Sequence, residues 1–208
     1  MMDIVIATRN RHKVRELQTL LPIRGIRWRS LAAFPSIGDA AERGRTFEAN
    51  ATHKARAVAR ATGCLALADD SGIEVEALGG APGVRSARFA GAHGRDEANN
   101  RKLLRVLGQR PPAARHARYR CVLALASSSR LLAVTRGRWE GRIAFQPAGR
   151  HGFGYDPIFL VPGLGKTVGQ LPARIKQRVS HRAQAARRLR PVLRRLVRRA
   201  SLHPKTTR

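Results

Sequence analysis

The stretch that decides the fold class is residues 3–21, which read DIVIATRNRHKVRELQTLL. The first five of these residues, in which four apolar residues follow Asp3, are typical of a short buried strand. A polar turn follows over residues 8–13, and apolar residues then recur at helical spacing, namely Val14, Leu17, Leu20 and Leu21. A strand, a polar turn and a helix in this order indicate an α/β protein. The turn lies where a helix N-terminus presents backbone N–H groups, which is a favourable place for a phosphate.

Similar patterns continue along the chain. They predict further strands near residues 25–29, 65–68, 117–126, 131–139, 142–145 and 158–160. They predict further helices from Thr46 to about Ala61, over residues 96–107 and from Ser180 onward. Thr46 is expected to cap its helix and Gly63 to end it. Pro191 is expected to kink or end the last helix.

Composition and charge limit the class of protein. The chain has 208 residues with 43% hydrophobic residues, which suits a single domain with a core. Lysine and arginine number 41 against 13 acidic residues, giving a net charge of +28, and 35 of the basic residues are arginine. This charge is compatible with a polyanionic partner. The base composition of the coding DNA could also produce so many arginines.

Cysteine usage and hydropathy exclude several classes. Cys64 and Cys121 lie far apart in apolar contexts, which predicts two buried free thiols rather than a disulfide or metal pair. No apolar run is long enough for a signal peptide or a membrane span. Secreted, fibrous and transmembrane classes are therefore excluded, and a cytoplasmic location is expected.

The scarce acidic residues are concentrated in one region. Seven of the 13 lie between Asp39 and Glu76, and Asp69-Asp70 directly follows the apolar run at 65–68. Adjacent aspartates at the end of a buried strand need a neutralising partner, and Mg²⁺ prefers oxygen ligands of this type. A turn made by Asp69-Asp70-Ser71-Gly72 that caps a helix remains the structural alternative.

Other polar and aromatic residues indicate a nucleotide. Lys13, Lys54 and Lys176 lie near the polar turns, and lysine offers a compact charge to phosphate. Phe153 and Tyr155 lie in a glycine-rich loop at residues 149–157, where they either stack on a base or plug the loop from below. The chain has neither a GxxxxGK[ST] loop nor a GxGxxG motif after its first strand. The residues thus favour a nucleotide hydrolase or transferase outside the P-loop and dinucleotide classes.

Six blocks, in order, resemble the inosine triphosphate pyrophosphatase family, whose members are also called XTP/dITP diphosphatases. The blocks are IVIATRNRHKVREL, TFEANATHKARAVA, ALADDSGIEVEALGGAPGVRSARFAG, NNRKLL, GFGYDPIFLVPGLGKT and KQRVSHRAQA. The resemblance covers about residues 3–190. It implies a mixed, elongated α/β sheet with flanking helices and two lobes around a central cleft. It also implies a homodimer that needs Mg²⁺ and hydrolyses ITP, dITP or XTP to the nucleoside monophosphate and pyrophosphate. Residues 1–200 would form the single two-lobed domain, and residues 201–208 a frayed basic tail.

The resemblance also implies a role for each matched residue. Glu42 and Asp70 would hold Mg²⁺ with support from Asp69, and Asp70 would activate the attacking water. Substrate-binding residues would be Thr8, Arg9, Asn10, Arg11, His12, Lys13, Lys54, Ser71, Phe153, Gly154, Tyr155, Asp156, Lys176, His181 and Arg182. Among these, Thr8, Asn10 and Lys13 would hold the triphosphate. Phe153 would stack on the purine.

Four positions depart from the usual family pattern. Arg9, His12 and Ala183 replace residues that are commonly glycine, and Ala49 stands where an acid is usual. Glu48 lies one place earlier, which turns its side chain by about 100° on a helix. If that acid belongs to the metal shell, we expect weaker Mg²⁺ binding here. Two other functions remain open: a nucleic-acid-binding protein without triphosphatase activity, and a family relative with a shifted triphosphate substrate.

Overall fold

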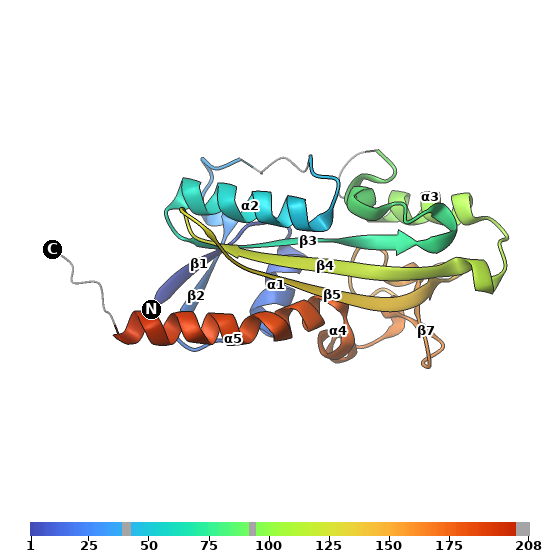
Figure 1. Cartoon of the computed structure of the whole chain (residues 1–208). Helices are drawn as coiled ribbons and strands as arrows, with labels where there is room; N and C mark the ends of the chain where they lie inside the picture. Colours follow the sequence, from blue (N-terminus) through green and yellow to red (C-terminus); the bar gives the residue numbers. More distant parts are fainter. Residues whose placement is uncertain (39–42, 92–94, 203–208) are drawn as a thin grey trace. The chain divides into compact units, whose positions relative to one another are not determined.

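The computed structural model describes residues 1–38, 43–91 and 95–202 (Figure 1). Contacts divide the chain into two compact units. Unit 1 contains Met1–Asp70, Val122–Arg136 and Gln184–Arg208, and unit 2 contains Ser71–Cys121 and Gly137–Ala183. Seven strands form one sheet in the order β2-β1-β3-β4-β5-β6-β7, so the predicted mixed α/β class is confirmed.

The first 30 residues of unit 1 form a parallel pair with a helical crossover. Strand β1 (Met2–Ile6) pairs in parallel with β2 (Ile26–Ser30) on one side and with β3 (Leu65–Val75) on the other. A strand paired on both sides is usually apolar throughout, and Ile4, Val5 and Ile6 are fully buried. Helix α1 (Arg11–Leu20) connects β1 to β2, as parallel pairing requires.

Helix α2 (Phe47–Thr62) begins and ends where the sequence predicts. The Thr46 hydroxyl accepts from the Ala49 N–H at 3.1 Å, and Gly63 adopts a left-handed conformation with φ 67° at the C-cap. The buried face of α2 consists mainly of alanine, which lets the helix lie close to the strands. Figure 1 shows α2 on one side of the strands of unit 1 and α5 on the other.

Strand β3 corrects the prediction that the strand ends at Ala68. It continues to Val75, so Asp69 and Asp70 lie within the strand, and the alternative of a helix-capping turn is wrong. Asp70 is followed by Ser71 and Gly72, which are common in turns. The sequence therefore does not indicate that the strand continues. The backbone N–H of Ile73 is satisfied by the Ser86 hydroxyl at 2.9 Å, a partner 13 residues away.

Unit 2 contains parts of the longest strands. Strand β4 (His116–Ala126) is followed by β5 (Leu131–Ile143), which is one strand rather than the two predicted. Gly141 lies between the two predicted strands, at a residue type that normally weakens a strand. Here glycine is required, since a Cβ at this position would lie 2.5 Å from the Phe159 ring. Strand β5 pairs antiparallel with β6 (Phe159–Val161), and β6 pairs with β7 (Lys166–Thr167).

The core of unit 2 is aromatic. The Tyr119 ring lies 4.5 Å from the Phe159 ring and 6.5 Å from the Trp139 ring between centroids. Helix α3 (Asp96–Leu107) buries Leu103 and Leu107 against this cluster. Helix α4 (Ala173–Val179) was not predicted from the sequence. Figure 1 shows α3 on one side of the strands of unit 2 and α4 on the other.

Helix α5 (His181–Leu202) passes through Pro191, so the prediction that proline ends the helix is wrong. Contacts within unit 1 hold the helix on both sides of this residue. The Arg190 guanidinium donates to the Leu20 carbonyl at 2.9 Å, and Val197 lies against Gly25. These contacts offset the hydrogen bond that proline removes. Ser201 and Leu202 of the predicted tail belong to α5, and residues 203–208 lie outside the described residues.

Two further sequence expectations can be compared with the structure. Both cysteines are free, and Cys121 is buried while Cys64 is partly exposed. Within the described ranges, no helix combines the length and the apolar character needed to span a bilayer.

The two tyrosines of the chain give a pH prediction. Burial, followed by the nearby Asp156 carboxylate, raises the pKa of Tyr119 well above its usual value, and burial raises the pKa of Tyr155. A raised tyrosine pKa favours the neutral folded form, so this stabilisation is complete below pH about 10 and is lost as the pH rises above that value. We expect tyrosinate absorbance to appear only as the circular dichroism of the fold is lost. Half-ionisation at pH about 10 in a folded protein would contradict this.

Candidate functional site

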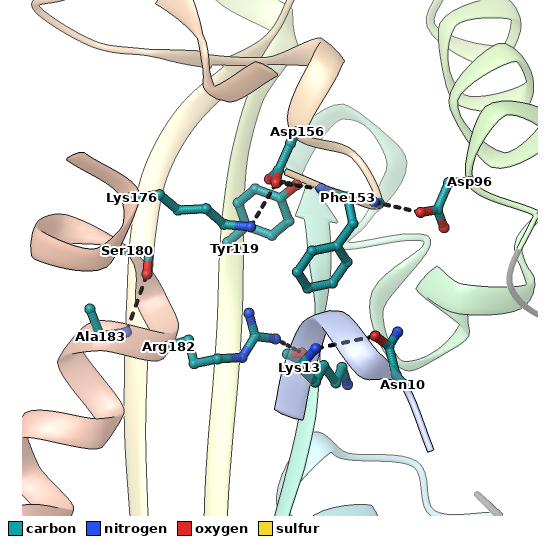
Figure 2. Close-up of polar contacts among 12 residues, drawn as sticks. Asn10, Lys13, Asp96, Tyr119, Phe153, Asp156, Lys176, Ser180, Arg182 and Ala183 are labelled. Carbon is teal, nitrogen blue, oxygen red and sulfur yellow. Dashed lines mark hydrogen bonds and ion pairs between the residues drawn. The ribbon is translucent and has the colours of Figure 1, made fainter. Parts of the chain in front are cut away.

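The polar turn at residues 8–13 is held by its own side chains. The Asn10 side chain caps α1 by accepting from the N–H groups of His12 at 2.9 Å and Lys13 at 3.2 Å (Figure 2). The Thr8 hydroxyl accepts from the Asn10 N–H at 3.1 Å. Two of the helix N–H groups that were expected to bind a phosphate therefore donate to Asn10 instead. A ligand at this turn would contact the Asn10 amide as well as the backbone.

The rest of the turn is more exposed. The Arg9 guanidinium donates to the Ile37 carbonyl at 2.6 Å, so this departure from the family pattern ties the turn to the segment after β2. Arg11 and His12 are exposed on the first turn of α1. These residues leave the turn open to solvent.

Two buried aspartates each contact a lysine in unit 1. The Lys13 ammonium lies 2.9 Å from the Asp69 carboxylate and 3.4 Å from the Asp69 carbonyl. The Lys54 ammonium lies 3.3 Å from the Asp70 carboxylate. The aspartates are only 1% and 4% exposed, and carboxylates this deeply buried need a positive partner. We call these four residues the carboxylate–lysine set.

The carboxylate–lysine set offers the oxygen donors that a divalent cation prefers. Mg²⁺ is commonly held by one or two protein carboxylates, with substrate phosphate and water completing its shell, so Asp69 and Asp70 fit this ion. Glu42, the other predicted ligand, lies outside the described residues. Among the described residues, no third acidic, histidine or cysteine side chain joins them in a metal-binding group. Glu48 instead pairs with Arg136.

In unit 2, Asp156 organises the glycine-rich loop. Its carboxylate accepts from the Lys176 ammonium at 2.6 Å, from the Tyr119 hydroxyl at 3.0 Å and from the Phe153 N–H at 2.9 Å (Figure 2). Asp156 is 1% exposed. A Cβ on Gly152 would lie 1.9 Å from the same carboxylate. The loop is therefore wrapped tightly around one buried charge.

The two aromatic residues of this loop have different environments. The Phe153 ring is partly exposed, with the Lys176 ammonium 4.3 Å and the Arg182 guanidinium 5.5 Å from its centroid. Tyr155 is buried, and its hydroxyl donates to the Ser86 carbonyl at 2.8 Å. Tyr155 therefore plugs the loop, whereas the Phe153 ring remains partly exposed.

The start of α5 contributes three buried polar residues. The Ser180 hydroxyl accepts from the Ala183 N–H at 3.2 Å, so Ser180 is an N-cap. The His181 ring stacks on Tyr119 at 4.5 Å with an 11° angle between planes. The Arg182 guanidinium donates to the Ser71 hydroxyl at 2.8 Å. Together with Phe153, Asp156 and Lys176, these residues form what we call the aromatic–cation set.

The predicted site residues separate into these two neighbourhoods. Unit 1 contains Thr8, Arg9, Asn10, Arg11, His12, Lys13, Lys54, Asp69 and Asp70. Unit 2 contains Ser71, Phe153, Gly154, Tyr155, Asp156, Lys176, His181 and Arg182. The sequence missed Asp96 and Asn100, whose side chains bind the backbone of Gly154 at 2.7 and 3.0 Å. The sequence feature that could have indicated them is a pair of polar residues four positions apart on a predicted helix, of which Asn100 lies on the buried side.

The fold and these two sets define an α/β protein with buried, lysine-paired carboxylates in unit 1 and a partly exposed aromatic ring beside two cations in unit 2. Residues 4–192 match the Ham1 family. A dITP/XTP pyrophosphatase from Geobacillus kaustophilus is 48% identical over 189 residues, covering 91% of this chain and 93% of that protein. The chain belongs to the Ham1 family, and the resemblance drawn from its motifs is confirmed.

Solved structures agree with this assignment. A HAM1 protein from Coxiella burnetii has a TM-score of 0.84 at 42% identity, covering 93% of this chain and 98% of that chain. The Ham1 protein of Staphylococcus aureus has a TM-score of 0.82 at 40% identity, covering 92% and 97% of the two chains.

Proposed function

We propose that this protein hydrolyses inosine- and xanthosine-type nucleoside triphosphates to the monophosphate and pyrophosphate. The carboxylate–lysine set carries the proposal, because buried paired acids beside two ammonium groups suit a metal-bound triphosphate. The names of the relatives support the same substrate class. The proposed activity also implies a cytoplasmic location, where nucleotide pools are found.

In this mechanism the protein positions the triphosphate and a water molecule. Thr8, Asn10 and Lys13 bind phosphate oxygens at the first turn, and Lys54 and Ser71 add contacts farther along the triphosphate. Asp70 accepts a hydrogen bond from the water and orients it for in-line attack on the α-phosphorus. The new bond joins the water oxygen to that phosphorus, the water proton passes to the Asp70 carboxylate, the α–β anhydride bond breaks, and pyrophosphate leaves. When bound at Asp69 and Asp70, Mg²⁺ supplies charge neutralisation for the phosphate oxygens.

The aromatic–cation set is assigned to the base. The partly exposed Phe153 ring offers a face for purine stacking, while Arg182 and Lys176 are the nearby cationic donors. Hypoxanthine and xanthine carry an oxygen acceptor at position 6, whereas adenine carries an amino donor there. A donor at this edge therefore rejects adenine, since two donors would face each other. Guanine shares the 6-oxo group and must be rejected at another position.

The direct test is pyrophosphate release with Mg²⁺ for ITP, dITP, XTP, GTP and ATP. We expect turnover of ITP, dITP or XTP to exceed that of ATP and GTP. Preference for another triphosphate would replace the proposed substrate with a shifted one. No turnover of any triphosphate by folded protein would overturn the enzymatic function.

Ala49 gives a prediction about metal affinity. An acid is usual at this position in the family, and here the neighbouring Glu48 is engaged by Arg136. If the missing acid belongs to the metal shell, Ala49→Glu should lower the Mg²⁺ concentration for half-maximal activity about tenfold, the lower end of the range for a supporting carboxylate. Ala61→Glu, at an exposed position near the end of α2, is the charge-matched control. An equal effect of both variants would indicate only a general electrostatic contribution.

Helix α5 presents exposed arginines that would attract nucleic acid as a second partner besides the nucleotide substrate. Six exposed arginines lie on it, namely Arg187, Arg188, Arg194, Arg195, Arg198 and Arg199. They fall within about 140° of arc and along about 18 Å of helix. This is one positive charge per about 3 Å, close to the phosphate spacing of about 3.4 Å along one strand of duplex DNA.

A charge-matched pair of variants tests this attraction. We expect Arg→Gln at positions 194, 195, 198 and 199 to reduce the salt slope of duplex DNA binding by about 3.6. Arg→Gln at positions 105, 110, 130 and 142, which are exposed on other elements, removes the same net charge. If both quadruple variants weaken DNA binding equally, the net charge of the protein causes the attraction and the arginines of α5 have no special role. Nucleic acid binding in place of triphosphate turnover would instead favour the non-enzymatic function.

We also propose a homodimer, as the family resemblance implies. Exposed apolar side chains such as Phe145 and Leu164 are available to a second copy. Light scattering of the purified protein tests this, with a mass near twice 22.9 kDa expected and a monomer mass contradicting it.

A further inference from the structure

We propose that helix α3 positions the base-binding loop through Asp96 and Asn100, which fix the backbone of Gly154 beside Phe153. The proposal rests on the proposed function, in which Phe153 stacks on the base. Asp96 and Asn100 are assigned as positioning residues, because their contacts reach the loop backbone.

The first observation is that α3 binds Gly154 from both sides. The Asp96 carboxylate accepts from the Gly154 N–H at 2.7 Å, and the Asn100 amide donates to the Gly154 carbonyl at 3.0 Å (Figure 2 shows Asp96). Residues four apart lie on the same face of a helix. Two rigidly spaced side chains thus orient the peptide groups on both sides of one residue.

The second observation is that Gly154 needs an external restraint. Its φ is 66°, in the left-handed region, and among the described residues no atom beyond its chain neighbours lies within 4 Å of the position a Cβ would take. Glycine has the broadest conformational freedom of any residue, so local packing does little to hold this backbone. The hydrogen bonds from α3 supply that restraint next to the ring that faces the base.

The third observation concerns the buried amide of Asn100. The residue is 6% exposed, and its Oδ1 is a buried atom without a hydrogen-bond partner among the described residues. An unsatisfied amide oxygen is costly, so an apolar residue would suit this position better on packing grounds alone. The contact with Gly154 accounts for an asparagine here.

The fourth observation is that α3 is firmly anchored. Leu103 and Leu107 are buried in the core of unit 2. On the same helix, Asn99 accepts from the Ala90 N–H at 2.7 Å and Lys102 donates to the Phe89 carbonyl at 2.6 Å. The helix therefore provides a fixed reference for the loop.

The arrangement also limits how the base is read. The Phe153 N–H is engaged by Asp156, and the Gly154 N–H is engaged by Asp96. These backbone donors are already used within the chain. Recognition of the base edge therefore does not fall to these two backbone N–H groups.

The test is steady-state kinetics with dITP and Mg²⁺. Removing a hydrogen bond to a charged group weakens binding about tenfold. Asp96→Ala should therefore raise KM about tenfold and change kcat less than about twofold. A rise in KM at nearly constant kcat is the pattern expected for lost substrate binding. Asp96→Asn should restore KM, because its amide oxygen still accepts from Gly154. Glu97→Ala is the matched control, since it removes the adjacent first-turn charge and Glu97 is an exposed residue that pairs with Arg101.

A double-mutant cycle separates positioning from general stability. In a Phe153→Ala background, Asp96→Ala should change KM less than about twofold, because the ring it positions is gone. Full additivity of the two KM effects, or an equal effect of Glu97→Ala, would overturn the proposal. If Asp96→Ala fails to fold, Asn100→Asp replaces it in the KM test, because this variant removes the donor to the Gly154 carbonyl.

These outcomes are distinct from failure of the proposed function. If the unmodified protein turns over no triphosphate, the proposed function fails and this inference fails with it. If the unmodified protein turns over dITP and both Asp96→Ala and Asn100→Asp keep its KM, only the positioning role fails.

Discussion

Asp70→Asn is expected to reduce kcat for dITP about 10³-fold, within the range for loss of a positioned base. Asparagine keeps the shape of the side chain and one accepting oxygen, so the strand and the Lys54 contact are largely preserved. It removes the negative charge that holds the metal and orients the water. The measurement is pyrophosphate release at saturating dITP and Mg²⁺.

Two controls accompany the Asp70 variant. Glu76→Gln removes an exposed acid from the same region of the chain and should leave kcat within about twofold, as for most surface changes. Thermal unfolding of Asp70→Asn checks that the fold is retained. A folded variant that keeps more than about a tenth of kcat would exclude Asp70 from the role of water-orienting base.

Lys176→Met is expected to destabilise the protein by about 3–5 kcal/mol, the cost of leaving a buried charge without its partner. Asp156 is almost fully buried, and the Tyr119 and Phe153 groups that also donate to it are neutral. The measurement is the free energy of unfolding from denaturant titration.

The double variant Lys176→Met/Asp156→Asn identifies the cause. Removing the buried carboxylate charge should recover part of the stability lost in the single variant, since no unpaired charge remains. Lys166→Met, at an exposed position, should cost less than about 0.5 kcal/mol. A cost below about 1 kcal/mol for Lys176→Met would show that Asp156 is compensated in another way.

Local features of the fold were predictable from the sequence because their causes are local. The apolar run of β1, the Thr46 cap and the left-handed Gly63 are each specified by a few neighbouring residues. The continuation of α5 through Pro191 and of β5 through Gly141 depends on tertiary contacts. Leu20 and Gly25 support α5, and Phe159 leaves room only for glycine at position 141.

The candidate site was predictable as a set of residue types but not as a set of contacts. The clustering of acids drew attention to Asp69 and Asp70, and the family motifs named the residues around Phe153. The pairing of Lys13 with Asp69, 56 residues apart, depends on how β1 and β3 align. Asp96 and Gly154, 58 residues apart, likewise meet only in the folded unit. Contacts at such separations leave no local pattern.

The contrast between abundant arginine and scarce lysine has a practical consequence for labelling. Lys13, Lys54 and Lys176 each contact an aspartate, and Lys102 donates to a carbonyl. Among the lysines that the structure describes, Lys166 alone is exposed. An amine-reactive fluorophore used sparingly should therefore attach at Lys166 ahead of the three lysines assigned to the substrate. A chain with 41 basic residues thus offers a small set of accessible amines for attaching a dye or a solid support.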